Sequence, residues 1–344
     1  MNILITGGSG FLGALLARTL LRQGKLSLRG APAQSIASVT LTDRVAPPDD
    51  LRGDPRVRHV PGDLLDLAAS RQLPPAGTQL VFHLAAAVSG ECEADFDLGM
   101  RSNLDATRAL LDACRAQGGG IAVSSERLTF VFASSLAVFG NLPGQPLPEP
   151  IQDNTLPTPQ SSYGIQKFIC EQLVADFTRK GFFAGRSVRL MTVSVRPGRP
   201  NGAASGFLSG MIREPLAGLR AACPVAPETQ VALASPARTV EGLIRAAQAS
   251  DADWGPLVAL NLPSLRTSVG EMAAALERVA GKEATALLDW TPDEAVRRLV
   301  RTWPGNVRWD RARALGLAAD VDFEAVVRGY VRENSEAVKL KVNA

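Results

Sequence analysis

The stretch Asn2-Ile-Leu-Ile-Thr-Gly-Gly-Ser-Gly-Phe-Leu-Gly13 decides the fold of this chain. Its first five residues, 2–6, predict a buried strand, and the glycines that follow predict a turn that opens a helix. We expect Gly7 to form the tight turn, Gly10 to let a phosphate approach the backbone, and Gly13 to let the helix pack on the strand. The segment therefore predicts a dinucleotide-binding site.

Alternating strands and helices continue through the first two-thirds of the chain. Further strands are predicted over 39–42, 57–60, 80–83, 129–134 and 187–195, and helices over 13–22, 103–117 and 162–180. Such alternation predicts an α/β protein with a Rossmann-type, doubly wound parallel sheet covered by helices on both faces. Residues 26–38 are predicted to form an enlarged loop between the first helix and the second strand.

A smaller C-terminal substrate lobe is expected, because the alternation loosens from about residue 197 into sequence rich in Gly, Pro and Ala. Later helices are predicted over 238–249, 268–279 and 292–299. The predicted NAD-binding domain comprises 1–196 with returning segments near 231–263, and the lobe comprises 197–230 and 264–335. Open α/β sheets bind ligands at the carboxyl ends of their strands, so we expect the substrate between the two parts.

The composition excludes several other classes of protein. The 344 residues carry a formal net charge of +3 without a run of basic residues, which argues against a nucleic-acid partner. Four widely spaced cysteines predict reduced thiols, and the sequence contains neither a metal-ligand motif nor a transmembrane stretch. We expect a soluble cytoplasmic protein without a metal ion or a membrane contact.

Asp43 predicts the choice of dinucleotide. It ends the second predicted strand, where a carboxylate accepts hydrogen bonds from the ribose hydroxyls of adenosine. The same charge would repel a 2′-phosphate, so NAD is favoured over NADP. Arg44 leaves NADP open, because an arginine beside the acid can accommodate that phosphate.

Other cofactor contacts are expected at the start of the first helix and at the ends of later strands. They are Phe11, Leu12, Asp63, Leu64, Leu84, Ala85, Ala86 and Val193. The N–H groups of residues 10–12 are expected to face the pyrophosphate. Asp63 is placed to accept a hydrogen bond from the adenine amino group, and the small residues at 85–87 leave room for the cofactor. Ordinary loop residues are the alternative for both segments.

Tyr163 and Lys167 lie four residues apart on a predicted helix and therefore share a face. A phenol titrates near pH 10, and a neighbouring ammonium favours its ionised form, so Tyr163 is a candidate general base. Lys167 is also expected to hold the nicotinamide ribose. Ser135, at the end of a predicted strand, is expected to orient the reacting substrate oxygen, with Ser134 as a competitor.

These motifs resemble those of the extended short-chain dehydrogenase/reductase superfamily over essentially the whole chain. The matching segments are 6–13, 63–64, 83–86, Asn103, 134–140 and 163–167. The resemblance implies catalytic roles for Ser135, Tyr163 and Lys167. It implies that Asn103 kinks its helix or relays a proton beside the cofactor, and that two helices from each subunit form a homodimer.

Departures from the nucleotide-sugar enzymes of this superfamily narrow the expected reaction. Leu136 stands where dehydratases generally place an acid, so elimination of water lacks its usual base. Segments 88–91, 94–100, 196–201 and 212–218 are similar to those of a branch of the superfamily that oxidises small sugar acids. This likeness implies NAD-dependent oxidation of a small anionic sugar acid at the hydroxyl next to its carboxylate.

A carboxylate substrate requires a cation, and Arg196 and Arg238 are the two candidates, either of which could instead be structural. Ser89 and Thr192 complete the expected substrate contacts together with Ser135. Two other functions remain open at this point. A nucleotide-sugar 4-epimerase would use the same Ser, Tyr and Lys, whereas a regulator that senses NAD would keep only the glycine turn.

Overall fold

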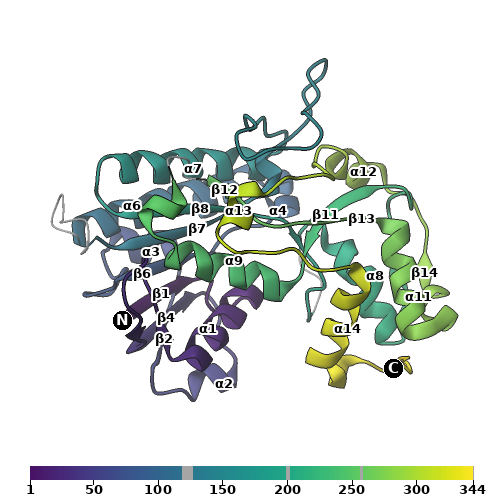
Figure 1. Cartoon of the computed structure of the whole chain (residues 1–344), viewed down its shortest axis with the longest axis horizontal. Coiled ribbons are helices and arrows are strands. Elements are labelled where there is room, and N and C mark those ends of the chain that lie inside the picture. The colour runs from purple at the N-terminus through teal and green to yellow at the C-terminus, as the bar shows by residue number, and fades with distance from the viewer. Residues whose placement is uncertain (118–126, 199–201, 256–258, 344) are drawn as a thin grey trace.

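The computed structural model describes residues 1–117, 127–198, 202–255 and 259–343. Within these ranges a seven-stranded parallel sheet has the order β12-β8-β7-β6-β1-β4-β5 (Figure 1). Its strands are β1 (Asn2–Thr6), β4 (Ser38–Asp43), β5 (Val57–Pro61), β6 (Leu80–His83), β7 (Thr129–Ser135), β8 (Ala184–Leu190) and β12 (Ala259–Asn261). The predicted Rossmann-type α/β fold is confirmed.

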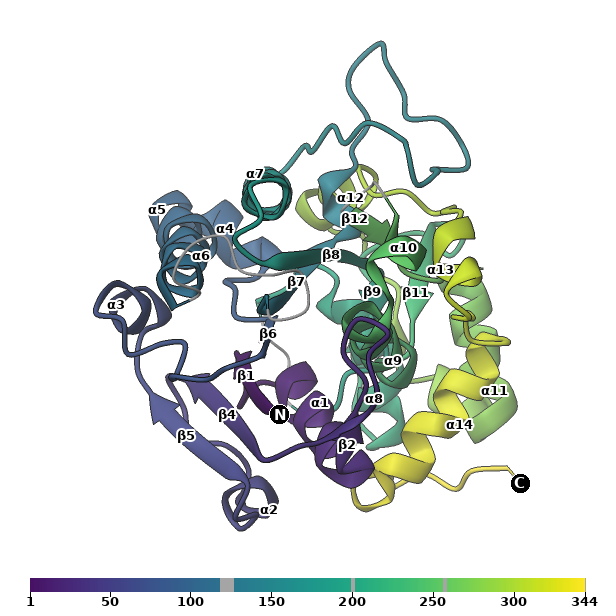
Figure 2. The same cartoon turned by 60° about the vertical axis from the view of Figure 1, so that its left-hand side comes forward.

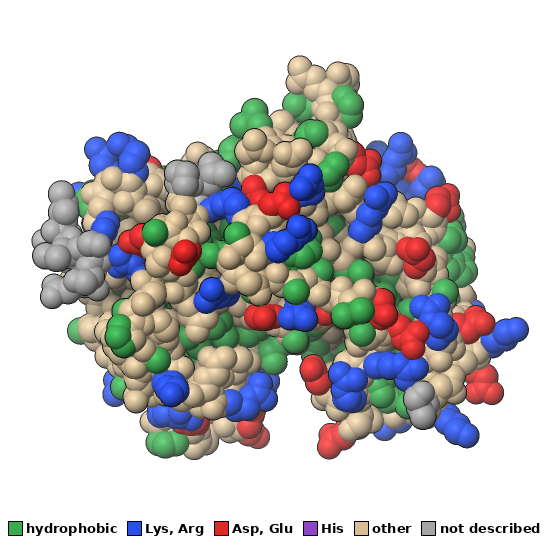
Figure 3. Space-filling model, in the orientation of Figure 1, with side chains coloured by type: hydrophobic (Ala, Val, Ile, Leu, Met, Phe, Trp, Pro, Cys, Tyr) green, Lys and Arg blue, Asp and Glu red, His purple; other side chains and the backbone are tan. Residues whose placement is uncertain are grey.

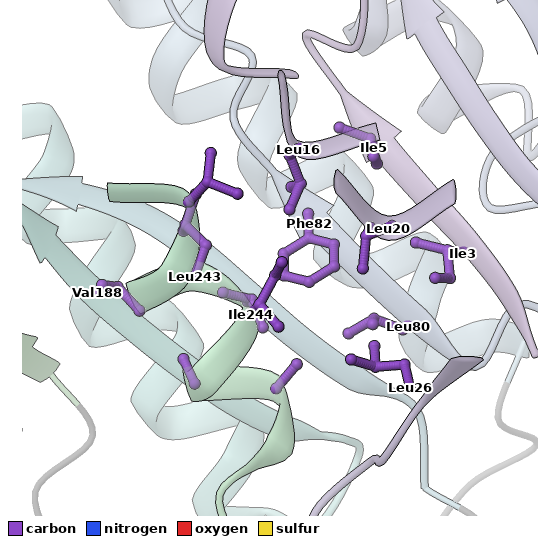
Figure 4. Packing of buried hydrophobic residues seen from close by; sticks show 14 of the residues in the cluster. Ile3, Ile5, Leu16, Leu20, Leu26, Leu80, Phe82, Val188, Leu243 and Ile244 are labelled. Carbon is purple, nitrogen blue, oxygen red and sulfur yellow. The ribbon is translucent and has the colours of Figure 1, made fainter. Parts of the chain in front are cut away.

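Helices cover both faces of this sheet (Figure 2). One layer contains α1 (Phe11–Gln23) and α9 (Pro236–Gln248), and the other contains α3 (Leu64–Ala69), α6 (Ala106–Gln117) and α7 (Ser162–Arg179). Strand β1 shows why a parallel sheet needs both layers. Ile3 and Ile5 pack with Leu16 and Phe82 under α1 (Figure 4), whereas Leu4 packs on the opposite face.

A second apolar core forms a lobe beside the carboxyl ends of the central strands (Figure 1). Its helices are α8 (Gly206–Leu216), α11 (Val269–Thr285) and α14 (Phe323–Glu333). Its strands are β9 (Thr192–Val193), β11 (Gln230–Ala234) and β13 (Leu265–Ser268), which form one sheet, and β10 (Ala221–Ala222) and β14 (Leu288–Asp289), which pair with each other. The division into two domains at the predicted boundaries stays a prediction.

Three details of the sequence interpretation are corrected. The single strand predicted over 187–195 is wrong, because β8 ends at Leu190 and β9 joins a different sheet after the buried Met191. The predicted loop at 26–38 contains a small hairpin formed by β2 (Lys25–Leu26) and β3 (Gln34–Ser35). The segment near 231–263 is divided, because β11 pairs in the lobe whereas α9 and β12 return to the central sheet.

Short helices complete the chain. They are α2 (Asp49–Arg52), α4 (Ser89–Ala94), α5 (Phe96–Gly99), α10 (Asp251–Trp254), α12 (Glu294–Val300) and α13 (Asp310–Ala314), with a π-helical segment at Met100–Asp105 and 3-10 turns at Leu136–Val138 and Ser335–Ala337. All four cysteines are buried free thiols. No helix in the described ranges is long and apolar enough to cross a membrane. Acidic and basic side chains are interspersed over the face shown in Figure 3.

Candidate active site

The glycine turn after β1 has the geometry of a phosphate cradle. Gly7 has φ +68°, and a Cβ there would lie 2.9 Å from the backbone nitrogen of Ala85. A Cβ on Gly13 would lie only 2.2 Å from the carbonyl oxygen of Gly7, so the close contact of helix with turn requires glycine. Gly10 caps α1 without a side-chain hydrogen bond, which leaves the first N–H groups of the helix without a capping group. This turn fits a dinucleotide pyrophosphate.

Asp43 lies beside this turn at the end of β4. Its carboxylate accepts hydrogen bonds from the N–H groups of Ser9 at 3.2 Å, Arg44 at 2.8 Å and Val45 at 3.4 Å. One section of the cleft contains Asp43 together with several of the other predicted cofactor contacts. These are Gly7, Gly10, Asp63, Leu64, Leu84, Ala85 and Ala86.

Arg44 is bound to Asp63 rather than projecting freely beside Asp43. The carboxylate of Asp63 pairs with Arg44, lies 3.5 Å from the guanidinium of Arg101, and accepts the N–H of Leu65 at 2.9 Å, which caps α3. Although burial opposes ionisation, the hydrogen bonds from Arg44 and Leu65 hold the pKa of Asp63 below its ordinary value. The adenine contact expected at Asp63 therefore competes with two interactions inside the protein. One is the ion pair with Arg44 and the other is the cap of α3.

The structure brings Ser135, Tyr163 and Lys167 together in the adjoining section of the cleft. This section also contains Gly7, Gly10, Phe11, Leu12, Gly13, Ser89, Thr192, Val193 and Arg196. Gly164 explains how Tyr163 reaches the end of β7. A Cβ on Gly164 would lie 2.1 Å from the carbonyl oxygen of Ala137, so the absence of a side chain lets α7 begin against the turn that follows Ser135.

The environment of Tyr163 differs from the one expected. Desolvation by the cleft walls raises the pKa of the phenol to about 12, and hydrogen bonding to Ser135 and the charge of Arg196 act in the opposite direction. Lys167 donates a hydrogen bond to the Ala133 carbonyl at 2.9 Å, and its Nζ lies 5.6 Å from the centre of the Tyr163 ring. Burial lowers the pKa of Lys167 to about 8. Lys167 was expected to lower the pKa of Tyr163, but in this geometry Ser135 and Arg196 have that effect.

The two candidate serines occupy different environments. Ser134 is 2% exposed and donates a hydrogen bond of 2.6 Å to the buried carboxylate of Glu171. Ser135 is partly exposed, its hydroxyl accepts the N–H of Ala137 at 3.1 Å, and it lowers the pKa of the Tyr163 phenol in the same cleft. The structure therefore favours Ser135 over Ser134 for contact with a substrate.

Of the two candidate arginines, only Arg196 reaches the cleft. Its guanidinium lies 3.4 Å from the Ser205 hydroxyl, and no carboxylate in the described part of the chain pairs with it. Burial and then the charge of Arg213 lower the pKa of Arg196. Arg238 is absent from the described lining of the cleft and pairs with Glu241 at 2.7 Å one helical turn away. The structure therefore favours Arg196 over Arg238 as the arginine that binds the substrate.

Ser205 and Trp303 are among the cleft residues that the sequence interpretation missed. Neither belongs to a recognisable motif, and Trp303 comes from a segment far along the chain. The turn at 196–201 is one of the segments that carry the resemblance. Its residues 199–201 lie outside the described ranges.

Asn103 lies behind the cleft rather than on its described lining. It is buried in the π-helical segment Met100–Asp105, where its side chain accepts the N–H of Ala87 at 2.8 Å and donates to Gln166 at 2.8 Å. This position agrees with the helix distortion implied by the resemblance, but a direct cofactor contact is not favoured. His83 is also structural, because its ring nitrogens contact Thr6 and Thr107 and burial lowers its pKa to about 3.

A Rossmann sheet whose glycine turn and Ser, Tyr and Lys side chains share one cleft defines an NAD-dependent oxidoreductase that acts on CH–OH groups. The chain belongs to the NAD dependent epimerase/dehydratase family, whose model matches residues 3–231. Its cofactor is NAD, as the sequence predicted.

Individual relatives agree with this assignment. The chain is 49% identical to a D-erythronate dehydrogenase of Cupriavidus necator, over 97% of this chain and 98% of that protein. It is 38% identical to a D-erythronate dehydrogenase of Haemophilus influenzae, over 96% and 99% of the two chains. A crystal structure described as a nucleoside-diphosphate-sugar epimerase from Agrobacterium tumefaciens superimposes with a TM-score of 0.83 at 40% identity, over 98% of this chain and 95% of that one. The resemblance inferred from the motifs is confirmed.

Proposed function

We propose that this protein oxidises the C2 hydroxyl of a small sugar acid, converting D-erythronate to 2-dehydro-D-erythronate. One observation carries the proposal: Arg196, which has no described carboxylate partner, shares a cleft with Ser135 and Tyr163. The cleft thus offers a cation for a carboxylate beside groups that act on a hydroxyl. The names of the two D-erythronate dehydrogenases support the same substrate class.

Each residue of the site has a separate role in the proposed oxidation. Tyr163 takes the proton of the C2 hydroxyl, and Ser135 hydrogen-bonds the same oxygen and orients it. NAD is proposed to lie with its pyrophosphate at residues 10–12, with its adenosine ribose at Asp43 and with Lys167 near its nicotinamide ribose. When bound there, NAD accepts the hydrogen and the electron pair that leave C2.

Burial of the phenol opposes its ionisation. A phenol with a pKa of about 12 is protonated near neutral pH even with Ser135 and Arg196 beside it, so Tyr163 needs further positive charge that stabilises its phenolate while it acts. The nicotinamide ring of bound NAD would supply such a charge. Arg196 would also hold the substrate carboxylate, which places the neighbouring C2 hydroxyl toward Tyr163.

Net formation of NADH tests the function directly. A panel of tetronic and related hydroxy acids, assayed first with NAD and then with NADP, is expected to give continuous NADH production with D-erythronate. Interconversion of nucleotide sugars without net NADH would instead identify a 4-epimerase. Binding of NAD without turnover of any hydroxy acid would identify a regulator that senses NAD.

For the assembly, we propose a homodimer formed through the outer face of α7. Ile165 and Ile169 lie one turn apart on this helix and are 46% and 37% exposed, and Phe96 on the neighbouring α5 is 61% exposed. Sedimentation equilibrium of the whole protein is expected to give a dimer, and of the Ile165→Lys/Ile169→Lys variant a monomer. A monomeric unmodified protein would contradict this interface.

A further inference from the structure

We propose that Glu171 is a positioning residue that fixes the Tyr163 and Lys167 side chains against the end of β7. It acts through a buried ion pair with Arg189 and does not touch the substrate. The inference rests on the proposed role of Tyr163 as the base, and it concerns how that base is held. Nothing in the reaction itself requires a carboxylate at this depth.

Three residues of α7 face three consecutive residues at the end of β7. Tyr163 shares the cleft lining with Ser135, and the Lys167 ammonium donates to the Ala133 carbonyl at 2.9 Å. Glu171, four residues after Lys167, accepts the hydroxyl of Ser134 at 2.6 Å. The spacing of four residues places all three side chains along one side of the helix. Glu171 therefore attaches α7 to β7 at the end of this row of side chains that lies farthest from the Tyr163 phenol.

Arg189 joins the same anchor to the next strand. It lies beside Ser134 in the β7–β8 register, and its guanidinium donates two hydrogen bonds to Glu171, at 2.9 and 2.8 Å. Glu171 is 1% exposed and Arg189 is 5% exposed. The guanidinium also lies 4.9 Å from the centre of the Phe139 ring. The two hydrogen bonds between Arg189 and Glu171 fix the distance and the rotation of α7 relative to β7 and β8.

Stability alone does not account for such a pair. Well-packed apolar residues of similar volume often replace a buried ion pair without loss of stability, because both charges must first be desolvated. What an apolar pair cannot reproduce is the directional bonding of Glu171 to Ser134 and Arg189. A displacement of about 1 Å in a reacting group can cost on the order of a hundredfold in rate. The geometry thus favours a positioning role.

The pair also affects the charge beside the phenol. The titratable groups that face Lys167 come from three elements: Tyr163, Cys170 and Glu171 on α7, Cys92 on α4, and His83 on β6. Arg189 faces the same region from β8 but is neutralised by Glu171. Removal of the carboxylate would leave Arg189 uncompensated, so that Lys167 loses its proton more readily. The pH dependence of kcat therefore reports on this ion pair as well as on the position of Tyr163.

The test compares Glu171→Gln with Asp251→Asn. The control also deprives a buried arginine of β8, Arg186, of a carboxylate partner, but Asp251 lies on α10, away from α7. Both variants are expected to lower the melting temperature. Only Glu171→Gln is expected to lower kcat, by about tenfold or more, and to shift the pH midpoint of kcat, with a smaller change in KM.

A second readout needs no substrate. The chain has only two tyrosines, so tyrosine labelled with carbon-13 at Cζ gives two signals, which Tyr330→Phe assigns. The Tyr163 signal is expected to move in Glu171→Gln and to stay unchanged in Asp251→Asn. If the unmodified protein turns over no sugar acid but this signal moves, the proposed function fails and the positioning role stands.

Equal kcat, pH midpoint and Tyr163 signal in the two variants would overturn the proposal. If Glu171→Gln does not fold, the apolar pair Glu171→Leu/Arg189→Met replaces it, because removing both charges together avoids an uncompensated buried charge. This double variant is expected to fold and still to show a lowered kcat and a moved Tyr163 signal. Unchanged values of both would equally overturn the positioning role.

Discussion

The ammonium of Lys167 donates a hydrogen bond to the Ala133 carbonyl at 2.9 Å, two residues before Ser135. The lysine is thereby attached to the strand that carries Ser135. Its Nζ lies 5.6 Å from the centre of the Tyr163 ring, so the helix, the strand and the two polar side chains form one connected unit. Arg196 then reaches this unit from the lobe side of the cleft.

The two serines at the end of β7 are predicted to respond differently to removal of their hydroxyls. Ser135→Ala should lower kcat by roughly tenfold to a hundredfold, because the reacting oxygen loses a hydrogen bond in the transition state. Ser134→Ala should mainly lower the melting temperature, since its partner is the buried Glu171. Steady-state kinetics and thermal unfolding of both proteins make the comparison. A larger loss of kcat in Ser134→Ala would reverse the assignment.

Arg196 is predicted to be the arginine that binds the substrate carboxylate. Arg196→Met should lower kcat/KM for D-erythronate by about tenfold to a hundredfold, because a hydrogen bond to a charged group contributes about 1.5–3 kcal/mol. Arg238→Met is the matched control, since Arg238 pairs with Glu241 on the surface of its own helix. Equal losses in both variants, or a loss confined to Arg238→Met, would contradict the prediction.

Asp43 is predicted to discriminate against NADP. Asp43→Asn removes the negative charge that faces the adenosine ribose, and the ion pair of Arg44 with Asp63 stays in place. The ratio of the dissociation constants for NADP and NAD should fall by about tenfold, as measured by quenching of tryptophan fluorescence. Asp66→Asn, on the nearby α3, should leave the ratio unchanged. An unchanged ratio in Asp43→Asn would show that another residue selects NAD.

His83 is predicted to make the folded state less stable in mild acid. Burial lowers its pKa from 6.5 to about 3, so the unfolded chain binds a proton first as the pH falls. The stabilisation is complete above pH 6.5, and about 2 kcal/mol should be lost between that pH and roughly pH 5. Urea unfolding at several pH values measures the loss. His83→Asn should flatten the dependence, and an equally steep dependence in that variant would rule out His83 as its cause.

The strand, turn and helix at the start of the chain were predictable because their signals are local. Gly7 has the positive φ of the turn, Gly13 lies against the Gly7 carbonyl in the same turn, and the continuous apolar run of β1 is visible in five residues. The pairing of Tyr163 with Lys167 was predictable for the same reason, since a spacing of four residues places two side chains on one helix face.

Features that depend on tertiary packing were not predictable. The sequence could not show that Lys167 would donate to Ala133, because that carbonyl belongs to a strand more than thirty residues away. The sequence also could not show which of Ser134 and Ser135 contacts the substrate, because the hydrogen bond of Ser134 to Glu171 depends on the packing of α7 on β7. Arg196 and Arg238 could not be separated for a related reason, since a motif position does not reveal that Glu241 binds the Arg238 guanidinium. The apolar stretch 187–195 likewise gave no sign of the change of sheet at Met191.

The turnover of Tyr163→Phe with D-erythronate and NAD tests the central claim most directly. This variant removes only the phenol oxygen and should bind NAD with an unchanged dissociation constant. The account predicts that kcat falls by about a hundredfold to ten-thousandfold, because no other group in the described cleft can accept the proton from the same position. A variant that folds, binds NAD and keeps kcat within about threefold of the unmodified protein would contradict it.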